Sequence, residues 1–410
     1  MRLEFARLTA MLALAACASG PSPPLGPIDL PRDLDPQEAA VVEAGNTFAF
    51  DLFGALASAA PDSNVFVSPI SVSMALGMAV NGAEGETYHQ MVETLGLSAL
   101  TLDQINASYR GLIDLLLDLD PRVETNVANS VWVREGFPVE EPFLEVNRRF
   151  FDATAQTLDF GGPGGVPTIN DWVRRETRGR IPSIIDRIPD HYVMFLINAV
   201  YFKGLWAEPF DPEKTREEPF HLFDGSTRTV RMMWHAEGRF PLVAMPAYMA
   251  VELPYGGEAF AMTIVVPREE RTLEDVVSGM DAAAWRDLVS RLETDRVGVA
   301  LPRFRLEYEK TLNDVLKSLG MEIPFQGGFA DFTKINRELG RDLYIDEVKH
   351  KTFVEVDEEG TEAAGATSVG VGIVSMPPQV VGDRPFLFVI RERLTGTILF
   401  IGQFVSPPEP

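Results

Sequence analysis

Hydrophobic and polar positions change their spacing along the chain, and these changes predict the order of helices and strands. Residues 39–59 and 102–119 carry apolar side chains on one face of a helix. Residues 193–202 and 259–267 are nearly continuous apolar runs, which is typical of strands buried on both faces. Helical patterns dominate early and strand patterns dominate late, so the chain is predicted to form one α+β domain.

Shorter patterns predict the remaining elements. Pro69 at a first helical position, with Ser68 before it, predicts a capped helix that is buried because residues 72–79 are almost wholly apolar. Gly396 is expected to mark the turn between two paired strands. Further helices are predicted to end near residue 96 and to cover 142–151, 168–177, 273–291 and 311–319, and further strands to begin at 64 and to cover 123–133, 154–159, 227–232, 249–253, 297–302, 304–308, 352–357, 385–391 and 397–405.

Composition excludes several classes of partner. The chain has 410 residues, of which 46% are hydrophobic, and a formal net charge of -24 without a Lys/Arg-rich block. A polyanion such as nucleic acid is therefore not expected as a partner. The five histidines are scattered without metal-ligand spacing, so neither a metal site nor a cofactor is predicted.

The first residues resemble a bacterial lipoprotein signal. A short basic start precedes the apolar run 8–16, which is too short to span a bilayer and ends at Cys17, the only cysteine of the chain. The resemblance implies removal of residues 1–16 and lipid modification of Cys17. Ala18 and Ser19, in place of an aspartate, favour the outer membrane of a bacterial cell envelope, on its periplasmic or surface face. A plain secretory signal cleaved near Ala16, giving a secreted protein, is the alternative.

Residues 17–38 are predicted to be a tether that carries the lipid. They are rich in proline, with serine and glycine, and lack a hydrophobic period. The folded domain is expected to occupy residues 39–408. Because the chain has a single cysteine, no intramolecular disulfide can form.

Residues 358–378 stand out between two strand-rich blocks. The segment consists mainly of glycine, alanine, threonine, serine and valine, with no aromatic residue and no charge after Glu362. So few large apolar groups cannot anchor a segment in a core, yet the residues are compatible with a strand. The composition is that of an exposed loop in one state and of a sheet strand in another.

Four blocks of sequence resemble the serpin family. Glu358–Ala366, EEGTEAAGA, is similar to the hinge of the serpin reactive loop, and RPFLF at 384–388 is similar to the strand after that loop. NAVYFKGLW at 198–206 resembles a central strand and its exit, and NVFVSPIS at 64–71 an early strand and helix. The resemblance implies a single α+β domain over 39–408, with a large mixed main sheet, smaller sheets, about nine helices and an exposed loop.

The resemblance also implies a function. In serpins a serine protease cleaves the loop, which then inserts into the main sheet and carries the covalently bound acyl-protease with it. The chain is accordingly expected to be a monomeric suicide-substrate inhibitor and not an enzyme, and no Gly-x-Ser-x-Gly motif of hydrolases is present. A non-inhibitory binding protein of the same fold and a cysteine-protease inhibitor remain alternatives.

By the family's register, the cleaved bond lies between Val374 and Ser375. Valine is small and uncharged, so it fits a shallow apolar pocket and not the acidic pocket of a trypsin-like enzyme. Elastase-like or subtilisin-like proteases are therefore the expected targets. Cleavage after Ile373 or Met376 is the alternative register.

The hinge decides between inhibitor and substrate, because alternate side chains must enter the sheet as the loop inserts. Small side chains at the inward positions impose little steric or desolvation cost, and the charge of Glu362 is expected to point outward. The hinge residues are Glu358, Gly360, Thr361, Glu362, Ala363, Ala364, Gly365 and Ala366.

Polar residues outside the loop match two further serpin features. Ser68, Ser71, Asn198 and His350 match a hydrogen-bonded cluster beneath the opening of the main sheet. Trp206 and an Arg303–Glu358 ion pair match the upper end of that opening. The helix predicted over 102–119 is acidic, where heparin-binding serpins carry basic residues, which argues against heparin as a partner.

Overall fold

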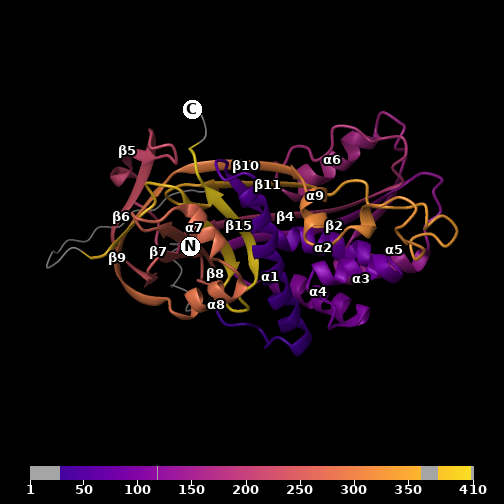
Figure 1. The fold of residues 1–410 in the computed structure, drawn as a ribbon, viewed down its shortest axis with the longest axis horizontal. Helices are drawn as coiled ribbons and strands as arrows, with labels where there is room; N and C mark the ends of the chain where they lie inside the picture. Colours follow the sequence, from indigo (N-terminus) through magenta and orange to yellow (C-terminus); the bar gives the residue numbers. More distant parts are fainter. Residues whose placement is uncertain (1–27, 118, 362–376, 408–410) are drawn as a thin grey trace, which may run out of the picture.

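A computed structural model describes residues 28–117, 119–361 and 377–407 of the chain. Its described part is a mixture of α-helices and β-strands (Figure 1). The helices are α1 Pro36–Ala59, α2 Pro69–Val80, α3 Gly85–Thr94, α4 Leu102–Leu117, α5 Glu141–Phe151, α6 Gly165–Glu176, α7 Leu273–Ser278, α8 Ala282–Ser290 and α9 Asn313–Ser318. The strands are β1 Val65–Val67, β2 Val123–Arg134, β3 Thr154–Leu158, β4 Met194–Leu205, β5 Arg216–His221, β6 Thr227–Ala244, β7 Tyr248–Tyr255, β8 Phe260–Pro267, β9 Glu293–Pro302, β10 Phe304–Thr311, β11 Lys349–Val356, β12 Gly360–Thr361, β13 Gln379–Val381, β14 Phe386–Glu392 and β15 Ile398–Phe404.

The largest sheet has nine strands and carries most of the late part of the chain. Its order is β1-β15-β14-β8-β7-β6-β9-β13, with β5 paired to β6. Its central strands β8, β14 and β15 are buried at every position, because helices or other strands cover both faces. The predicted pair of closing strands is confirmed, and Gly396 adopts the left-handed conformation in the turn that joins them.

A second sheet is divided into two pieces. Four strands have the order β12-β4-β2-β3, and two more, β10 and β11, form a separate antiparallel pair. Within the described residues, no ladder hydrogen bonds join β4 to β11. The two pieces nevertheless face each other, because residues of both strands line common cavities.

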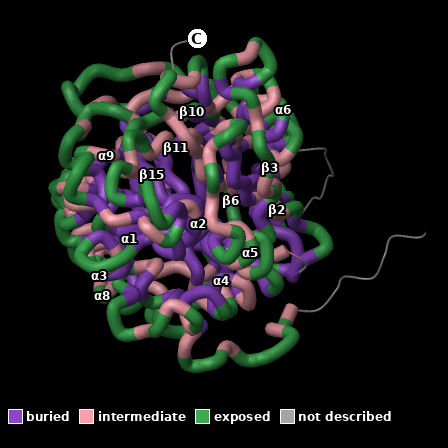
Figure 2. The backbone as a smooth tube through the Cα atoms, turned by 90° about the vertical axis from the view of Figure 1, so that its right-hand side faces the viewer, coloured by how far each residue is buried: buried purple, intermediate pink, exposed green. Residues whose placement is uncertain are grey.

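Helices cover both faces of the four-stranded piece. The apolar helix α2 packs against β4 from inside the molecule, and Figure 2 shows it among the buried segments. On the other face α6 places Trp172 edge-on against Trp132 of β2. The prediction that α2 is buried is confirmed.

The folded domain begins earlier than residue 39, the predicted boundary. Asp35 caps α1 in a capping box with Glu38, so the helix starts at Pro36. Ile28, Leu30 and Leu34 pack against the core. The described residues of the predicted tether are thus part of the domain, because their apolar side chains find a surface to cover.

Three other predictions need correction. The helix predicted over 273–291 is two helices, α7 and α8, because Asp281 caps a new helix after Gly279. The strand predicted over 227–232 continues to Ala244 as β6. Ser68 occupies the N-cap position of α2, but its side chain makes no capping hydrogen bond.

The strand predicted over 193–202 exists as β4, but it is not fully buried. Its first positions, together with Asn198 and Val200, are half-buried. The physical reason is its place beside the division of the sheet: β2 pairs with one edge of β4, but among the described residues only the short β12 pairs with the other edge. Among the described residues, the longest apolar helical stretch falls short of what a membrane span requires.

Candidate functional site

The hinge begins directly after β11, at the end of the divided sheet where β4 finishes. The Asp357 amide donates to the carbonyl of Gly360 at 3.0 Å, which turns the chain back on itself. The Asp357 carboxylate also accepts a hydrogen bond from the Glu359 amide, also at 3.0 Å. After this turn the chain runs antiparallel to β4, with Gly360 opposite Leu205 and Thr361 opposite Gly204.

Gly360 is the residue that this turn requires. Its φ of +154° lies in a region that L side chains rarely adopt, and an added Cβ would lie 2.2 Å from the carbonyl oxygen of Gly204. Gly204 in turn lies close to the ring of Tyr255. Two glycines therefore allow the hinge backbone to approach the end of β4.

Aromatic side chains hold the start of the hinge. The Trp206 indole donates to the carbonyl of Asp357 at 2.9 Å and stacks on Tyr255, with ring centroids 4.5 Å apart. The Tyr255 hydroxyl and the Thr361 hydroxyl lie 2.8 Å apart in a hydrogen bond, and Thr361 is only 3% exposed. Burial raises the pKa of Tyr255, which keeps the phenol neutral. The first two residues of a new strand are thus already fixed in the sheet.

Glu358 is fixed beside this contact. One of its carboxylate oxygens lies 3.4 Å from Arg303 Nε, and the other accepts a hydrogen bond from the Thr215 hydroxyl at 2.7 Å. The ion pair predicted between Arg303 and Glu358 is therefore present. The Phe210 amide donates to the Glu358 carbonyl at 2.8 Å, which anchors the backbone as well.

In the middle of the divided sheet, His350 of β11 meets the start of α2. Its Nε2 accepts a hydrogen bond from the Ser68 amide at 3.0 Å, and the Ser68 hydroxyl donates to the carbonyl of Leu399 at 2.9 Å. Burial lowers the pKa of His350 to about 4. A neutral ring is also what the bond needs, because protonation would remove the acceptor.

On the opposite piece, Asn198 of β4 donates to Asn129 of β2 at 2.7 Å, and Asn129 donates to the carbonyl of Phe151, also at 2.7 Å. The Asn198 amide oxygen is buried and has no partner among the described residues. A buried acceptor normally has a hydrogen-bond partner, so the free oxygen of Asn198 is what we expect where an additional strand could supply a donor.

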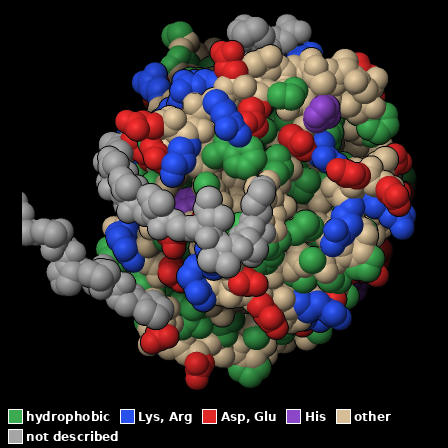
Figure 3. Space-filling view, turned by 90° about the vertical axis from the view of Figure 1, so that its left-hand side faces the viewer, with side chains coloured by type: hydrophobic (Ala, Val, Ile, Leu, Met, Phe, Trp, Pro, Cys, Tyr) green, Lys and Arg blue, Asp and Glu red, His purple; other side chains and the backbone are tan. Residues whose placement is uncertain are grey.

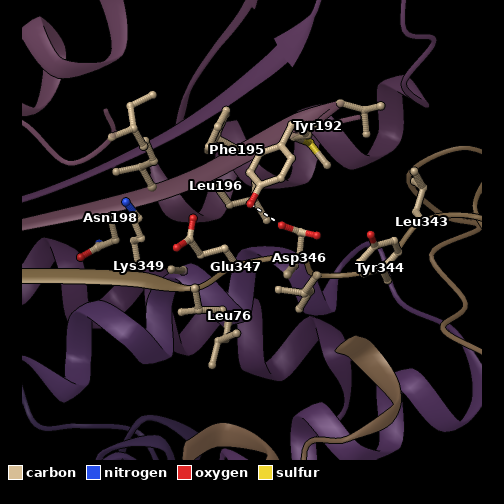
Figure 4. A pocket seen from close by; sticks show the side chains of 18 of the residues that line it. Leu76, Tyr192, Phe195, Leu196, Asn198, Leu343, Tyr344, Asp346, Glu347 and Lys349 are labelled. Carbon is tan, nitrogen blue, oxygen red and sulfur yellow. Dashed lines mark hydrogen bonds between the residues drawn. The ribbon is translucent and has the colours of Figure 1, made fainter. Parts of the chain in front are cut away.

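A cavity of about 210 Å³ lies between the two pieces of the sheet (Figure 4). Ser71 and Leu76 of α2 form its inner wall, and Asn198 and His350 line it from opposite strands. Of the predicted polar cluster, the structure brings Ser71, Asn198 and His350 to this one cavity and joins Ser68 to it through His350. The cavity lies between β4 and β11, where the described part of the chain places no strand.

A sequence model of the family described as "Serpin (serine protease inhibitor)" matches residues 43–407. The chain belongs to the serpin family. An uncharacterised serpin-like protein of Thermococcus kodakarensis is 37% identical over 91% of this chain and 87% of its own length. The human leukocyte elastase inhibitor is 32% identical over 89% of this chain and 98% of its own length. The native crystal structure of tengpin, a thermophilic serpin, matches with a TM-score of 0.83 at 30% identity, covering 92% of this chain and 95% of tengpin.

The serpin resemblance found the hinge and cluster residues but missed several that hold them. Asn129, Tyr255 and Thr215 were not predicted as site residues. Asn129 carried no distinctive signal, since its strand β2 also contains Glu124, Asn126 and Ser130, and only the structure places Asn129 directly opposite Asn198. Tyr255 and Thr215 carried none, because their contacts depend on how distant segments pack.

Several predicted site residues lie outside the described residues. They are Cys17, Glu362, Ala363, Ala364, Gly365, Ala366, Val374 and Ser375.

No group of three or more metal-ligating side chains occurs in the part of the chain that the structure covers. The face seen in Figure 3 carries acidic, basic and hydrophobic side chains side by side, without a large area of one charge.

Proposed function

We propose that this serpin is a single-use inhibitor of serine endopeptidases with elastase-like or subtilisin-like specificity. The observation that carries the proposal is the divided sheet, in which a strand begins at Gly360–Thr361 beside β4 and, within the described residues, no strand lies between β4 and β11. A strand placed there would pair with both neighbours and close the sheet. Cleavage of the loop frees it to do so.

The proposed reaction stops halfway through ordinary proteolysis. The protease serine attacks the carbonyl of Val374, an ester forms, and the peptide bond to Ser375 breaks with release of a new amino terminus. Insertion of residues 361–374, about 46 Å of strand at roughly 3.3 Å per residue, moves the acyl-linked protease along the sheet before water can hydrolyse the ester. The acyl chemistry belongs to the protease, so the serpin needs no catalytic residue of its own.

The hinge supports inhibition over simple cleavage. Thr361 is buried and small, and its hydroxyl has a partner in Tyr255. The next inward positions, Ala363 and Gly365, are smaller still. No charged side chain has to enter the sheet early in insertion, so the desolvation cost stays low. A related serpin, the leukocyte elastase inhibitor, is named for a protease of the proposed class.

Incubation with an elastase-like and with a subtilisin-like protease, followed by a denaturing gel, tests the proposal. We expect a complex of the summed mass that survives denaturation, and a released peptide that begins at Ser375. Cleavage without a complex would support a non-inhibitory serpin. A stable complex with papain-like enzymes alone would support a cysteine-protease inhibitor.

We also propose that Cys17 carries a lipid that holds the inhibitor on the cell envelope, in the outer membrane. Support comes from the sequence: a lone cysteine closes the short apolar run 8–16. Replacement Cys17→Ser should move the protein from the detergent phase to the aqueous phase on partitioning. Unchanged partitioning would refute the anchor and leave the inhibitor proposal intact.

A further inference from the structure

The carboxylate of Asp346 bridges the two pieces of the divided sheet at the end of the cavity where β4 begins. Tyr192 precedes β4 by two residues, and its hydroxyl donates to Asp346 Oδ2, which lies on the segment leading into β11. His191 Nε2 lies 3.2 Å from the other oxygen of Asp346. Figure 4 shows the Tyr192 ring pointing across the cavity toward Asp346. One side chain of the β11 piece is therefore bound from the β4 piece.

The Tyr192 side of this contact is fixed to its own piece of the sheet. The guanidinium of Arg134, at the end of β2, donates to the carbonyls of Pro189 at 3.2 Å, Asp190 at 2.9 Å and Tyr192 at 2.5 Å. Three hydrogen bonds from one side chain hold the segment before β4. Tyr192 therefore moves with β2 and β4.

The Asp346 side is fixed to the other piece. Asn313, at the start of α9, donates to the Asp346 carbonyl at 2.6 Å and accepts from the Val348 amide at 2.8 Å. The Leu312 amide donates to the Val348 carbonyl at 2.9 Å. Asp346 therefore moves with β10 and β11, and the Tyr192–Asp346 contact joins two separately anchored bodies.

The hydrogen bonds also act on the carboxylate itself. Burial opposes ionisation of Asp346, but hydrogen bonds from Tyr192, His191 and Tyr344 outweigh it and hold the pKa of the carboxyl below its ordinary value. Asp346 is thus a charged acceptor at neutral pH. A hydrogen bond to a charged acceptor is stronger than one between neutral groups.

The register of the hinge places the end of an inserted strand at this contact. Gly360 lies opposite Leu205 and Thr361 opposite Gly204, so each pair of numbers sums to 565. An antiparallel strand that keeps this register brings Ile373 opposite Tyr192 and Val374 opposite His191. Its backbone would lie about 4.8 Å from each neighbour and would take the space that the phenol and the carboxylate now bridge.

We propose that Tyr192 and Asp346 form a clasp that the last residues of the inserting loop must open, so that these two positioning residues set the share of cleavage events that end in a trapped protease. This inference rests on the proposed function. Insertion competes with hydrolysis of the acyl-enzyme, and a clasp at the final pairing position slows only the completion of insertion. The clasp also joins the two pieces of the uncut sheet.

Tyr192→Phe tests the clasp, because it removes the hydroxyl and keeps the ring. We expect the intact form to melt about 2 °C lower, the loop-cleaved form to melt at the wild-type temperature, and insertion to run up to about tenfold faster. Fewer inhibitor molecules should then be consumed per protease molecule trapped, measured with the elastase-like or subtilisin-like enzyme that forms the complex. Asp346→Asn is a second variant with the same expected direction.

Tyr344→Phe is the matched control. Tyr344 also hydrogen-bonds to Asp346 but lies on the same segment, so its hydroxyl does not join the two pieces. We expect both forms of this variant to behave as wild type. Equal loss of stability in the intact and cleaved forms of Tyr192→Phe, or an equal effect of Tyr344→Phe, would refute the clasp alone. If the cleaved wild-type chain melted no higher than the intact one, the proposed function and the clasp would both be refuted.

Discussion

The two main sheets of this serpin are built from similar sequence but are completed to different degrees. In the nine-stranded sheet, β14 pairs with β8 on one side and with β15 on the other, and all its residues are buried. In the divided sheet, β4 pairs with β2 from Met194 to Gly204, whereas within the described residues it pairs with β12 at only two positions. The apolar run of β4 resembles that of β8, yet β4 is half-buried at several positions where β8 is fully buried.

Under the proposed mechanism, the position between β4 and β11 is where insertion of the cleaved loop would release free energy. A strand added between β4 and β11 would cover both strands. It would also bring hydrogen-bond donors close to the unpartnered amide oxygen of Asn198. At about 1 kcal/mol for each new hydrogen bond, roughly a dozen residues of strand would contribute on the order of 10 kcal/mol, before the entropy of ordering the loop is subtracted. The nine-stranded sheet has no comparable vacancy among its described strands.

Blocking the first step of insertion should give the largest effect. Thr361→Arg places a charge at a position that is 3% exposed and faces Tyr255, where burial of an unpaired charge costs several kcal/mol. We expect the yield of covalent complex to fall by at least tenfold while loop cleavage continues, so the inhibitor becomes a substrate. A denaturing gel against the target protease measures both products.

The control for this substitution is Thr361→Ser, which keeps the hydroxyl that bonds to Tyr255 and should retain complex formation. Continued trapping by Thr361→Arg at the wild-type yield would contradict the role of the hinge, and with it the functional difference between the two sheets.

Acid should loosen the divided sheet through His350. Burial lowers the pKa of His350 to about 4 from an ordinary 6.5. The unfolded chain therefore takes up a proton below about pH 6.5, while the folded chain does so only near pH 4. The stability that depends on a neutral His350 is complete above pH 7 and is lost as the pH falls from 6.5 to 4, by up to about 3 kcal/mol.

Urea unfolding of the intact form across this pH range measures that slope. His350→Gln should flatten it, whereas replacement of His89, which is exposed on α3, should leave it unchanged. An identical slope in wild type and His350→Gln would show that other groups cause the acid sensitivity.

A smaller effect is expected from two tryptophans that donate comparable hydrogen bonds in the two sheets. Trp206→Phe removes the indole donor to Asp357 at 2.9 Å, and Trp234→Phe removes the donor to Glu218 at 3.0 Å. Each should lower the free energy of unfolding by about 1 kcal/mol. Only Trp206→Phe should also alter the yield of covalent complex, because only Trp206 contacts the hinge. If both variants changed the yield of covalent complex equally, the contact of Trp206 with the hinge would have no separate role in inhibition.

Much of the fold could be predicted because its helices and strands have local sequence signals. The helix at Pro69 and the closing strands around Gly396 follow from spacing and turn residues. The split of the helix predicted over 273–291 could also have been found, since Gly279 and Asp281 are ordinary stop and start signals. The half-burial of β4 could not, because an apolar run has the same pattern whether or not its neighbouring strand is present.

The candidate site divides in the same way. The hinge residues and the Ser68, Asn198 and His350 cluster could be named through resemblance to a family. Their partners could not: the Ser68–His350 hydrogen bond joins residues 282 apart in sequence, and the Tyr192–Asp346 contact joins residues 154 apart. Hydrogen bonds over such separations depend on which surfaces meet, and single-residue patterns carry no record of that.

By itself, the amino-acid sequence determined which segments become helices and strands, and that residues 358–378 are small enough either to leave a sheet or to enter one. Only the tertiary structure decided that the described strands of one sheet pair continuously while those of the other fall into two pieces, with a cavity and a carboxylate bridge between them. The reason is physical: local backbone preference acts over a few residues and is written in their side chains, whereas strand pairing and cavity closure depend on the simultaneous packing of the whole chain.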